Sequence, residues 1–262
     1  MKLMFHYCET LKLTGLRMSH SRLTRQRIWD RLKSVARPDT RFHMQFADFI
    51  PDFDGVEAAT DRITALPVFQ DCRLAFVTPD NSLTELRRRL ITARVPMVTA
   101  TYNIQRGFLY IAPDAVPRGA EHYAAWLDGL EHFGRPVTLE QIAALGQFDF
   151  MATGASAVSV DGVRFGKGHG FFDLEWGMFS DLGLARDTVS VAAIVHDVQV
   201  VEDHLQMNET DIPVDLIATP SRIIHVQRQG RRPRGMKWDL LAPKEIQDIP
   251  PLKELARMRG VA

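Results

Sequence analysis

The chain has 262 residues, 45% of them hydrophobic, and its 32 basic and 32 acidic side chains give a formal net charge of zero. This length and composition allow a large core in one α/β domain or two small ones, and the balanced charge excludes a global field that would steer the protein to nucleic acid or to a membrane. Two cysteines cannot build a disulfide framework and no apolar run reaches the roughly 20 residues that span a bilayer, so the sequence predicts a cytoplasmic protein.

Residues 1–20 are predicted to form a variable N-terminal extension. Residues 1–16 mix charged and apolar side chains and lack the apolar segment of a signal peptide. Met18 comes just before the first convincing helical pattern. We therefore expect either that Met18 is the natural start or that residues 1–17 are the extension.

The first helical pattern covers residues 23–36 and ends before Pro38. Its other face is basic, for which a solvated helix surface is the ordinary explanation; the residues are Arg22, Arg25, Arg27, Arg31 and Lys33. The next helix is expected to start at Asp54, because Glu57 lies three residues later as in a capping box.

Strand and helix patterns then alternate. Residues 74–78 predict a buried strand, Ser82 and Glu85 suggest a second capping box at the start of a helix, and residues 96–102 predict the next strand. This order implies a parallel sheet with right-handed crossover connections. Residues 107–112 are expected to add a further strand.

The second half of the chain continues these patterns. Aromatic residues at helical spacing predict a core helix over residues 122–133, and residues 138–145 predict a short capped helix. Apolar runs predict strands at residues 148–153, 189–195, 214–219 and 223–226. His196 follows one of these strands, where ligands of parallel sheets gather, although a histidine bonded to the local backbone is the more ordinary explanation.

The most informative feature is the run at residues 162–173, Gly-Val-Arg-Phe-Gly-Lys-Gly-His-Gly-Phe-Phe-Asp. Its three alternating glycines let backbone N–H groups close on an anion, and Arg164 and Lys167 place positive charge where phosphate oxygens would lie. Asp173 could hold the magnesium ion of a nucleotide. Residues 171–182 have helical spacing, so the run is expected to enter a helix N-terminus, where anions are favoured.

Other interpretations of this run remain open. It is not a Walker A loop, because no serine or threonine follows Lys167, and its glycine spacing differs from the dinucleotide fingerprint. A glycine-rich turn between a strand and a helix is the ordinary explanation of such spacing.

The run resembles the phosphate loop of the 5-formyltetrahydrofolate cyclo-ligase (methenyltetrahydrofolate synthetase) family, Arg-x-Gly-x-Gly-x-Gly-Tyr-Tyr-Asp. Residues 209–220, Glu-Thr-Asp-Ile-Pro-Val-Asp-Leu-Ile-Ala-Thr-Pro, resemble the family's segment His-Asp-x-x-Val-Asp-x-x-x-Thr. The resemblance is clear over residues 148–226 and weaker over residues 21–111. It implies a three-layer, Rossmann-like open α/β sheet, mostly parallel, of the cyclo-ligase type, with residues 21–226 as a single domain.

The resemblance also implies a reaction and two cofactors, ATP and Mg²⁺. ATP would phosphorylate the N5-formyl oxygen of 5-formyltetrahydrofolate, N10 would attack the activated carbon, and phosphate would leave to give 5,10-methenyltetrahydrofolate. The protein would act by positioning and charge neutralisation. Arg164 and Lys167 would be the catalytic residues, and residues 79–82 would supply a carboxylate on the folate side.

The remaining site residues follow from the same resemblance. Asp173 and Asp211 match the family's magnesium positions, and Asp215 is the next candidate, although an aspartate before a buried strand is often a turn residue. Nucleotide contacts are assigned to Gly166, Lys167, Gly168, His169, Gly170, Phe171, Phe172 and Arg25. The family's usual lysine, which reaches the ATP phosphate, corresponds in position to Ser21 of this chain. Arg25 or Arg22 would therefore have to take the role of that lysine.

The chain departs from the authentic enzymes at several positions. Phe171 and Phe172 replace two tyrosines, and Leu174 and Glu175 stand where the enzymes usually have a basic residue. This pattern, with residues 238–241 and 249–255, is closer to a cyclo-ligase-like paralogous branch, whose members do not all have demonstrated activity. A nucleotide-binding paralogue that acts on another small molecule is therefore the alternative function.

Residues 227–262 are predicted to form a basic tail. Its cluster of Arg228, Arg231, Arg232, Arg234 and Lys237 could contact RNA phosphates, which keeps a non-enzymatic RNA-binding module as a third hypothesis, but a solvated linker is more ordinary. Apolar residues should pack the tail on the domain: Trp238, Leu240, Leu241 and Leu252. We expect a small-molecule substrate, a folate by resemblance, with no membrane or nucleic-acid partner, and a monomer or homodimer.

Overall fold

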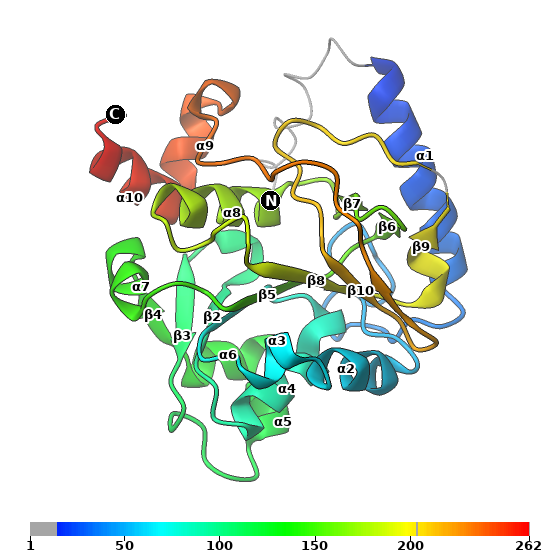
Figure 1. Cartoon of the computed structure of the whole chain (residues 1–262), viewed down its shortest axis with the longest axis horizontal. Helices are drawn as coiled ribbons and strands as arrows, with labels where there is room; N and C mark the ends of the chain where they lie inside the picture. Colours follow the sequence, from blue (N-terminus) through cyan, green and yellow to red (C-terminus); the bar gives the residue numbers. More distant parts are fainter. Residues whose placement is uncertain (1–14, 203, 262) are drawn as a thin grey trace.

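A computed structural model describes residues 15–202 and 204–261 of the chain, so the predicted extension lies largely outside the described residues. An eight-stranded sheet forms its centre (Figure 1). The strands are β1 (Ala75–Val77), β2 (Met97–Ala100), β3 (Phe108–Ile111), β4 (Arg135–Val137), β5 (Phe150–Thr153), β8 (Ser190–Ile194), β10 (Leu216–Ala218) and β11 (Ile223–His225). Their spatial order is β11-β10-β8-β5-β1-β2-β3-β4.

The inner strands β10, β8, β5, β1 and β2 run parallel to one another. The edges are antiparallel, with β11 pairing with β10 on one side and β3 and β4 following β2 on the other. The sequence prediction of a mostly parallel, open α/β sheet is therefore confirmed. Antiparallel pairing begins at β3 because only residues 101–107 separate it from β2, which is too short for a crossover helix.

Helices cover both faces of the sheet (Figure 1). Successive side chains of β1 alternate between the faces: Phe76 lies in one core and Ala75 and Val77 in the other. The first core is covered by α7 (Leu139–Leu145), α8 (Phe171–Asp181) and α10 (Pro250–Arg259). The second is covered by α2 (Val56–Thr64), α3 (Pro67–Gln70), α4 (Thr84–Thr92), α5 (Glu121–Ala124) and α6 (Leu127–Phe133).

A second, three-stranded sheet lies beside the first and carries the start of the glycine run. Its order is β7-β6-β9, formed by β6 (Ala157–Ser159), β7 (Arg164–Phe165) and β9 (Val200–Val201). The helix α1 (Gly15–Leu32) packs on it through Ile28 and Leu32, which join Phe165 in a third hydrophobic core. This core brings the basic helix α1 to the glycine run.

The capping predictions had different outcomes. Thr138 and Gln141 form the capping box of α7, as the pattern 138–145 predicts. The box predicted at Asp54 is wrong, because α2 starts from Gly55 in a left-handed conformation and Glu57 pairs with Arg37 at 3.4 Å.

Two further helix predictions need correction. The box predicted at Ser82 and Glu85 is wrong: a 3-10 helix, η2 (Asn81–Leu83), precedes α4, and Glu85 pairs instead with Arg88 and Arg89, each at 2.6 Å. The helix predicted over residues 122–133 is divided into α5 and α6, because Trp126 has an extended backbone.

The C-terminal segment is part of the packed fold. Leu252 and Leu255 of α10 are buried in the same core as α8, and Trp238 and Leu241 pack against it. Leu240 is 48% exposed, contrary to the expectation. The shorter helix α9 (Pro243–Asp248) precedes α10, and both lie on the side of the sheet that α8 covers (Figure 1).

The interpretation of the basic cluster as a solvated linker is wrong for two of its residues. Arg228 pairs with Asp187 at 3.0 Å, and the side chain of Arg232 is fully buried. The exposed members are Arg231, Arg234 and Lys237. Within the described ranges, no helix has the length and apolar character needed to cross a membrane.

Candidate functional site

The glycine run connects β7 to α8. Gly168 and Gly170 have φ angles of 111° and 66°, which residues with a Cβ adopt only at a cost. Gly170 is the N-cap of α8, so the helix begins at Phe171 as the helical spacing predicts. The first backbone N–H groups of a helix have no partner within it and attract anions. The local structure is therefore a glycine loop that leads into a helix N-terminus, and this arrangement suits a phosphate group.

Arg164 lies at the foot of this loop with its side chain only 6% exposed. One terminal nitrogen, Nη2, donates to Oδ1 of Asp173 at 2.6 Å, and the guanidinium lies 4.5 Å from the centre of the Phe172 ring. The Nε atom is buried, and no described residue accepts a hydrogen bond from it. Buried donors are normally paired, so this nitrogen is a place for an acceptor from outside the described residues.

The two predicted magnesium residues are close to each other. Oδ1 of Asp173 also accepts from the backbone N–H of Ile212 at 3.1 Å, next to Asp211 in sequence. Burial raises the pKa of Asp173 to about 6 against the opposing effect of Arg164, and Asp211 raises it further. Asp211 accepts from the backbone of Asn208 at 2.7 Å, and burial also raises its pKa. Asp211 is thus both a turn residue and part of the site.

Arg25 reaches the loop from α1. Its Nε donates to the carbonyl oxygen of Gly166 at 2.9 Å, and its guanidinium lies 5.4 Å from the centre of the Phe165 ring. A Cβ placed on Gly168 would lie 3.8 Å from that guanidinium carbon. The arginine therefore lies against the outer side of the glycine loop.

Lys167 and His169 extend the site in another direction. The Lys167 Nζ donates to the carbonyl oxygen of Asp48 at 3.1 Å and to Oδ1 of Asn103 at 3.4 Å, above the Tyr102 ring at 5.0 Å. Burial lowers the pKa of Lys167 and that of His169, whose ring lies 5.7 Å from the ring of Phe171. Lys167 is therefore bound to a neighbouring loop rather than to the Arg164–Asp173 pair.

The two phenylalanines differ in exposure. Phe172 is 5% exposed and lies between Arg164 and Phe76. The ring centres of Phe172 and Phe76 are 6.5 Å apart. Phe171 is partly exposed beside His169. Phe172 therefore supports Arg164 from the protein interior, and Phe171 is the ring that remains accessible to a ligand.

The loop after β1 lies near Lys167 and Glu175, because its residue Asp80 acts on the pKa of both. Oδ2 of Asp80 accepts from Thr78 Oγ1 at 2.6 Å and from the N–H of Gly154 at 3.0 Å. Arg87 of α4 is fully buried and donates to the carbonyl oxygens of Asp80 and Thr78. Arg87 was not predicted from the sequence, although its position beside Leu86 and Leu90 on an apolar helix face is a signal for a buried arginine.

A second missed residue is Glu175, which is 2% exposed on α8. Burial raises its pKa well above the usual value, and the charged groups acting on it include Asp80, Arg164 and Lys167. Its Oε2 has no hydrogen-bond partner among the described residues. An acidic residue on the apolar face of the predicted helix 171–182 is the signal that identifies it.

Two other candidate residues, His196 and Asp215, have structural roles. Nδ1 of His196 accepts from the N–H of Val198 at 3.2 Å and caps the 3-10 helix η4 (Asp197–Gln199), which is the ordinary explanation given for this histidine. Asp215 pairs with Arg232 and Arg228 and accepts from the N–H of Val191 at 2.8 Å. Asp215 is thus committed to the packing of the C-terminal segment rather than to the site.

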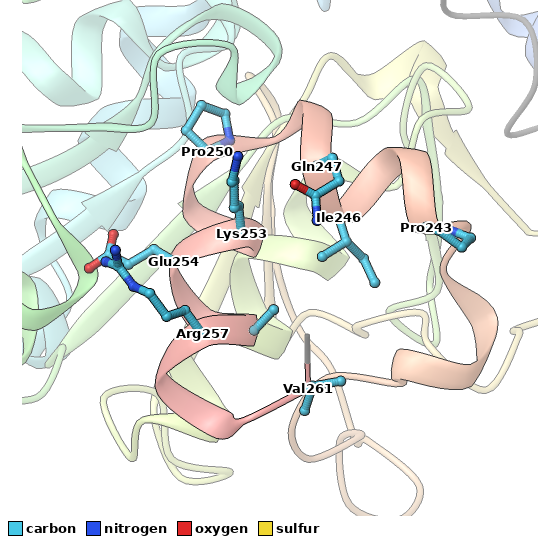
Figure 2. A pocket seen from close by; sticks show the side chains of 9 residues that line it. Pro243, Ile246, Gln247, Pro250, Lys253, Glu254, Arg257 and Val261 are labelled. Atoms are coloured by element: carbon cyan, nitrogen blue, oxygen red, sulfur yellow. The ribbon is translucent and has the colours of Figure 1, made fainter.

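A separate cavity of about 620 Å³ lies between α9 and α10 (Figure 2). Ile246, Pro250 and Val261 contribute to its largely apolar lining, and Lys253 and Arg257 add charged groups. Its lining comes from residues 243–261 and includes none of the predicted site residues. The cavity is therefore distinct from the glycine loop.

The residues around the loop fit a magnesium nucleotide. No group of three or more His, Cys, Asp or Glu side chains in the described part of the chain forms a complete metal centre. Magnesium bound with a nucleotide needs only one or two carboxylates, because phosphates and waters supply the other oxygens. Asp173 and Asp211 provide two carboxylates, and the unpaired Nε of Arg164 fits a phosphate oxygen.

Comparisons with known proteins agree with this architecture. A methenyltetrahydrofolate synthase domain-containing protein of Danio rerio is 30% identical over 246 residues, which cover 91% of this chain and 62% of that protein. The Homo sapiens protein of the same name is 29% identical over 234 residues, covering 88% of this chain and 60% of that one. The chain thus spans 62% and 60% of the length of these two relatives.

A solved structure shares the fold. The NMR structure of Aquifex aeolicus 5,10-methenyltetrahydrofolate synthetase is 17% identical, with a TM-score of 0.50, over 82% of this chain and 96% of that one. The model of the 5-formyltetrahydrofolate cyclo-ligase family matches residues 17–220, which include the glycine run and the segment around Asp211. The chain therefore belongs to the 5-formyltetrahydrofolate cyclo-ligase family.

Proposed function

We propose that the protein is an ATP- and Mg²⁺-dependent ligase of the cyclo-ligase type, which converts 5-formyltetrahydrofolate into 5,10-methenyltetrahydrofolate through a phosphorylated formyl group. The observation that carries the nucleotide half of this proposal is the buried guanidinium of Arg164. It lies at the foot of a glycine loop that leads into a helix N-terminus, and its Nε has no acceptor within the described structure. The family supports the folate half.

The residues around the loop have separate roles in this proposal. The backbone N–H groups of residues 166–170 bind phosphate oxygens at the start of α8. Arg164 carries five N–H groups in a fixed fork, so it can keep its bond to Asp173 and donate Nε–H to a phosphate. Asp173 and Asp211 would hold the magnesium ion. Arg25 fixes the loop through the Gly166 carbonyl.

The remaining chemistry is positioning. Bound Mg-ATP would supply the phosphoryl group that activates the formyl oxygen, and the protein needs no covalent nucleophile. Lys167, held above Tyr102 by two oxygen acceptors, places a positive charge beside the loop. Positive charge at that place stabilises phosphoryl oxygens in transit. We therefore keep Arg164 and Lys167 as the proposed catalytic residues.

The direct test is turnover of 5-formyltetrahydrofolate with ATP and Mg²⁺, followed by the absorbance of the methenyl product. The proposal predicts turnover that requires both ATP and Mg²⁺ and that falls strongly in Arg164→Met. The exposed Arg231→Met variant should retain wild-type turnover. Absence of turnover together with absence of folate binding in calorimetry would reject the cyclo-ligase function.

A nucleotide-binding paralogue that acts on another small molecule is the second candidate. The observation in its favour is Phe172, which is buried beneath Arg164 and offers neither a tyrosine hydroxyl nor an accessible ring to a substrate. This candidate predicts Mg-ATP binding without 5-formyltetrahydrofolate binding. A protein that bound no nucleotide in calorimetry would contradict both candidates.

The RNA-binding hypothesis receives no support from the geometry. Arg228 and Arg232 of the basic cluster are engaged in ion pairs with Asp187 and Asp215 inside the fold. The oligomeric state, a monomer or a homodimer, stays a prediction from the sequence.

A further inference from the structure

Unpaired buried atoms concentrate near the glycine loop. Four buried side-chain atoms have no hydrogen-bond partner within the described ranges: Thr60 Oγ1, Ser82 Oγ, Arg164 Nε and Glu175 Oε2. Such atoms are uncommon in folded proteins, and each requires an explanation. Thr60 lies on α2, but the other three lie in the glycine run, on α8 or in the loop after β1. Their concentration indicates a place where a ligand completes the hydrogen bonding.

Glu175 is the most unusual of these residues, because it interrupts an apolar face of α8. Phe172 and Phe179 lie one turn before and after it. The ring of Phe179 packs 4.9 Å from the ring of Phe76 and 4.9 Å from that of Phe148, deep in the core. An acidic side chain that is 2% exposed in this row is costly unless it is paired. Core packing alone therefore does not explain its presence.

The charged neighbours of Glu175 come from both sides of the site. Asp80 belongs to the loop after β1, Arg164 to β7 and Lys167 to the glycine loop. The loop after β1 also contains Ser82, whose Oγ lies 2.9 Å from the position that a Cβ on Gly154 would take. The loop after β1 follows the carboxyl end of a parallel strand, where ligands of open α/β sheets bind, whereas the glycine loop follows β7, which pairs antiparallel with β6. Glu175 thus lies where the two loops meet.

The cations near Glu175 are already committed to other acceptors. Arg164 donates to Asp173, and Lys167 donates to Asp48 and Asn103. The side chain of Glu175 makes no hydrogen bond or ion pair with any residue that the structure describes, and its buried Oε2 is unpaired. A donor for its carboxyl oxygen must therefore come from outside this part of the chain.

The chemistry of a carboxyl group limits what that donor can be. In either protonation state a carboxyl keeps at least one oxygen that accepts hydrogen bonds. An anionic ligand group could pair only with the protonated form, through its O–H, because the ionised form would repel it. An amine, amide or amidine-like N–H group satisfies the oxygen directly. The unpaired oxygen of Glu175 therefore favours ligands that carry an N–H group at this position.

We propose that Glu175 is a specificity-determining residue, whose unpaired carboxyl oxygen accepts a hydrogen bond from an N–H group of a small-molecule substrate held between the glycine loop and the loop after β1. This inference deepens the proposed function, because it relies on that function to place a substrate beside the nucleotide. It assigns to α8 a role in substrate choice in addition to its role at the phosphate site.

The test compares Glu175→Met, which removes the acceptor at similar volume, with Glu175→Gln, which keeps one acceptor oxygen. Calorimetry would measure binding of 5-formyltetrahydrofolate, of pterin and of Mg-ATP. We expect Glu175→Met to weaken the binding of the N–H-bearing ligands at least about tenfold and Glu175→Gln to recover part of the loss. Mg-ATP affinity should change less than about twofold in both. The exposed Glu140→Gln variant is the control and should bind like wild type.

Stability provides a readout that does not depend on the ligand. Because the unpaired carboxyl destabilises the unliganded protein, Glu175→Met should melt at the wild-type temperature or about 2–4 °C above it. A structural carboxyl would give the opposite result, with a lower melting temperature and parallel losses for all three ligands. That result would overturn the inference.

The outcomes separate this inference from the proposed function. If wild type turns over 5-formyltetrahydrofolate and Glu175→Met binds it equally well, the inference fails and the cyclo-ligase function stands. If wild type neither binds nor turns over 5-formyltetrahydrofolate but binds pterin in a Glu175-dependent way, the cyclo-ligase function fails and the inference stands. If wild type binds neither ligand, both fail.

Discussion

Two buried arginine–aspartate pairs in this fold differ in how completely they are bonded. Arg232 uses all three of its nitrogens: Nε donates to the Pro213 carbonyl at 2.9 Å, Nη1 to the carbonyls of Asp187 and Val189, and Nη2 to Asp215. Arg164 is also buried beside Asp173, with 6% of its side chain exposed, but its Nε has no acceptor in the described structure. Each guanidinium also lies over an aromatic ring, that of Trp176 or that of Phe172.

This difference distinguishes an ion pair that stabilises the fold from an ion pair that is proposed to bind a ligand. The saturated Arg232 pair joins the C-terminal segment to the ends of β8 and β10, so its value lies in the folded state. The unsaturated Arg164 pair leaves a donor at the foot of a glycine loop, and under the proposed function this donor binds a phosphate oxygen. Substitution of one arginine should mainly affect stability, and substitution of the other should mainly affect ligand affinity.

The largest expected effect is on stability at the saturated pair. Arg232→Met removes one of the donors of Asp215, which keeps Arg228 and the N–H of Val191, and takes the Arg232 donor from several carbonyl groups; breaking such a buried pair should lower the free energy of unfolding by about 3 kcal/mol. Urea unfolding would measure this change. Its exposed neighbour is the control, because Arg231→Met should stay within about 0.5 kcal/mol of wild type. A loss below about 1 kcal/mol at Arg232 would contradict the structural role.

The next effect concerns the aspartate of the unsaturated pair. Burial raises the pKa of Asp173 from 3.8 to about 6, so the folded protein holds this proton where the unfolded chain has already lost it. The contribution of Asp173 to stability is therefore complete below about pH 4 and falls as the pH rises through about 6. The shift corresponds to about 3 kcal/mol as an upper limit.

Urea unfolding of wild type and Asp173→Asn without ligand, from pH 4 to pH 7, would isolate this contribution. The Asn variant should become more stable relative to wild type as the pH rises. A stability difference that did not vary with pH would show that the carboxyl keeps an ordinary pKa in the folded protein.

A smaller effect is expected at Arg164 itself. Arg164→Met removes a charge-assisted donor to phosphate, which should weaken Mg-ATP binding about thirtyfold, or about 2 kcal/mol. Its unfolding free energy should fall less than that of Arg232→Met, since the substitution removes fewer bonds. Calorimetry and urea unfolding of the two variants side by side would check both statements. Unchanged Mg-ATP affinity combined with a large loss of stability would make the two pairs equivalent and remove the comparison.

The smallest effect is expected at Arg25, which holds the loop from outside. Arg25→Ala removes the 2.9 Å bond to the Gly166 carbonyl and should weaken Mg-ATP binding about fivefold, or about 1 kcal/mol. Arg31→Ala, an exposed arginine in the last turn of the same helix, is the matched control. Equal affinities of the two variants would show that Arg25 only contributes to the general charge of α1.

The sequence predicted the parts of this fold that local patterns determine. Apolar runs identified the inner strands, and the glycines with the helical spacing after them identified the loop and the start of α8. The strands β6, β7 and β9 were not predicted, because they are segments of two or three residues outside the apolar runs that marked the other short strands, and their pairing fixes them. The capping boxes at Asp54 and Ser82 were wrong because Glu57 and Glu85 form ion pairs instead.

The candidate site likewise contains residues that could be predicted from the sequence and residues that could not. The resemblance identified the residues that share one stretch of sequence, Arg164 and Asp173, and the structure places them 2.6 Å apart. It did not identify Glu175, because Asp80, a charged neighbour of Glu175 in the loop after β1, is distant in sequence and only the fold brings the two near each other. Arg232 was misinterpreted for the opposite reason: its basic neighbours in sequence are exposed, whereas its own side chain is buried against Asp215.

A crystal structure with Mg²⁺ and a non-hydrolysable ATP analogue would test the central claim most directly. We predict phosphate oxygens within hydrogen-bond distance of the backbone N–H groups of residues 166–170 and of Arg164 Nε, with the Arg232–Asp215 pair unchanged. A nucleotide bound elsewhere, for example in the cavity between α9 and α10, with Arg164 Nε still unpaired, would contradict the account.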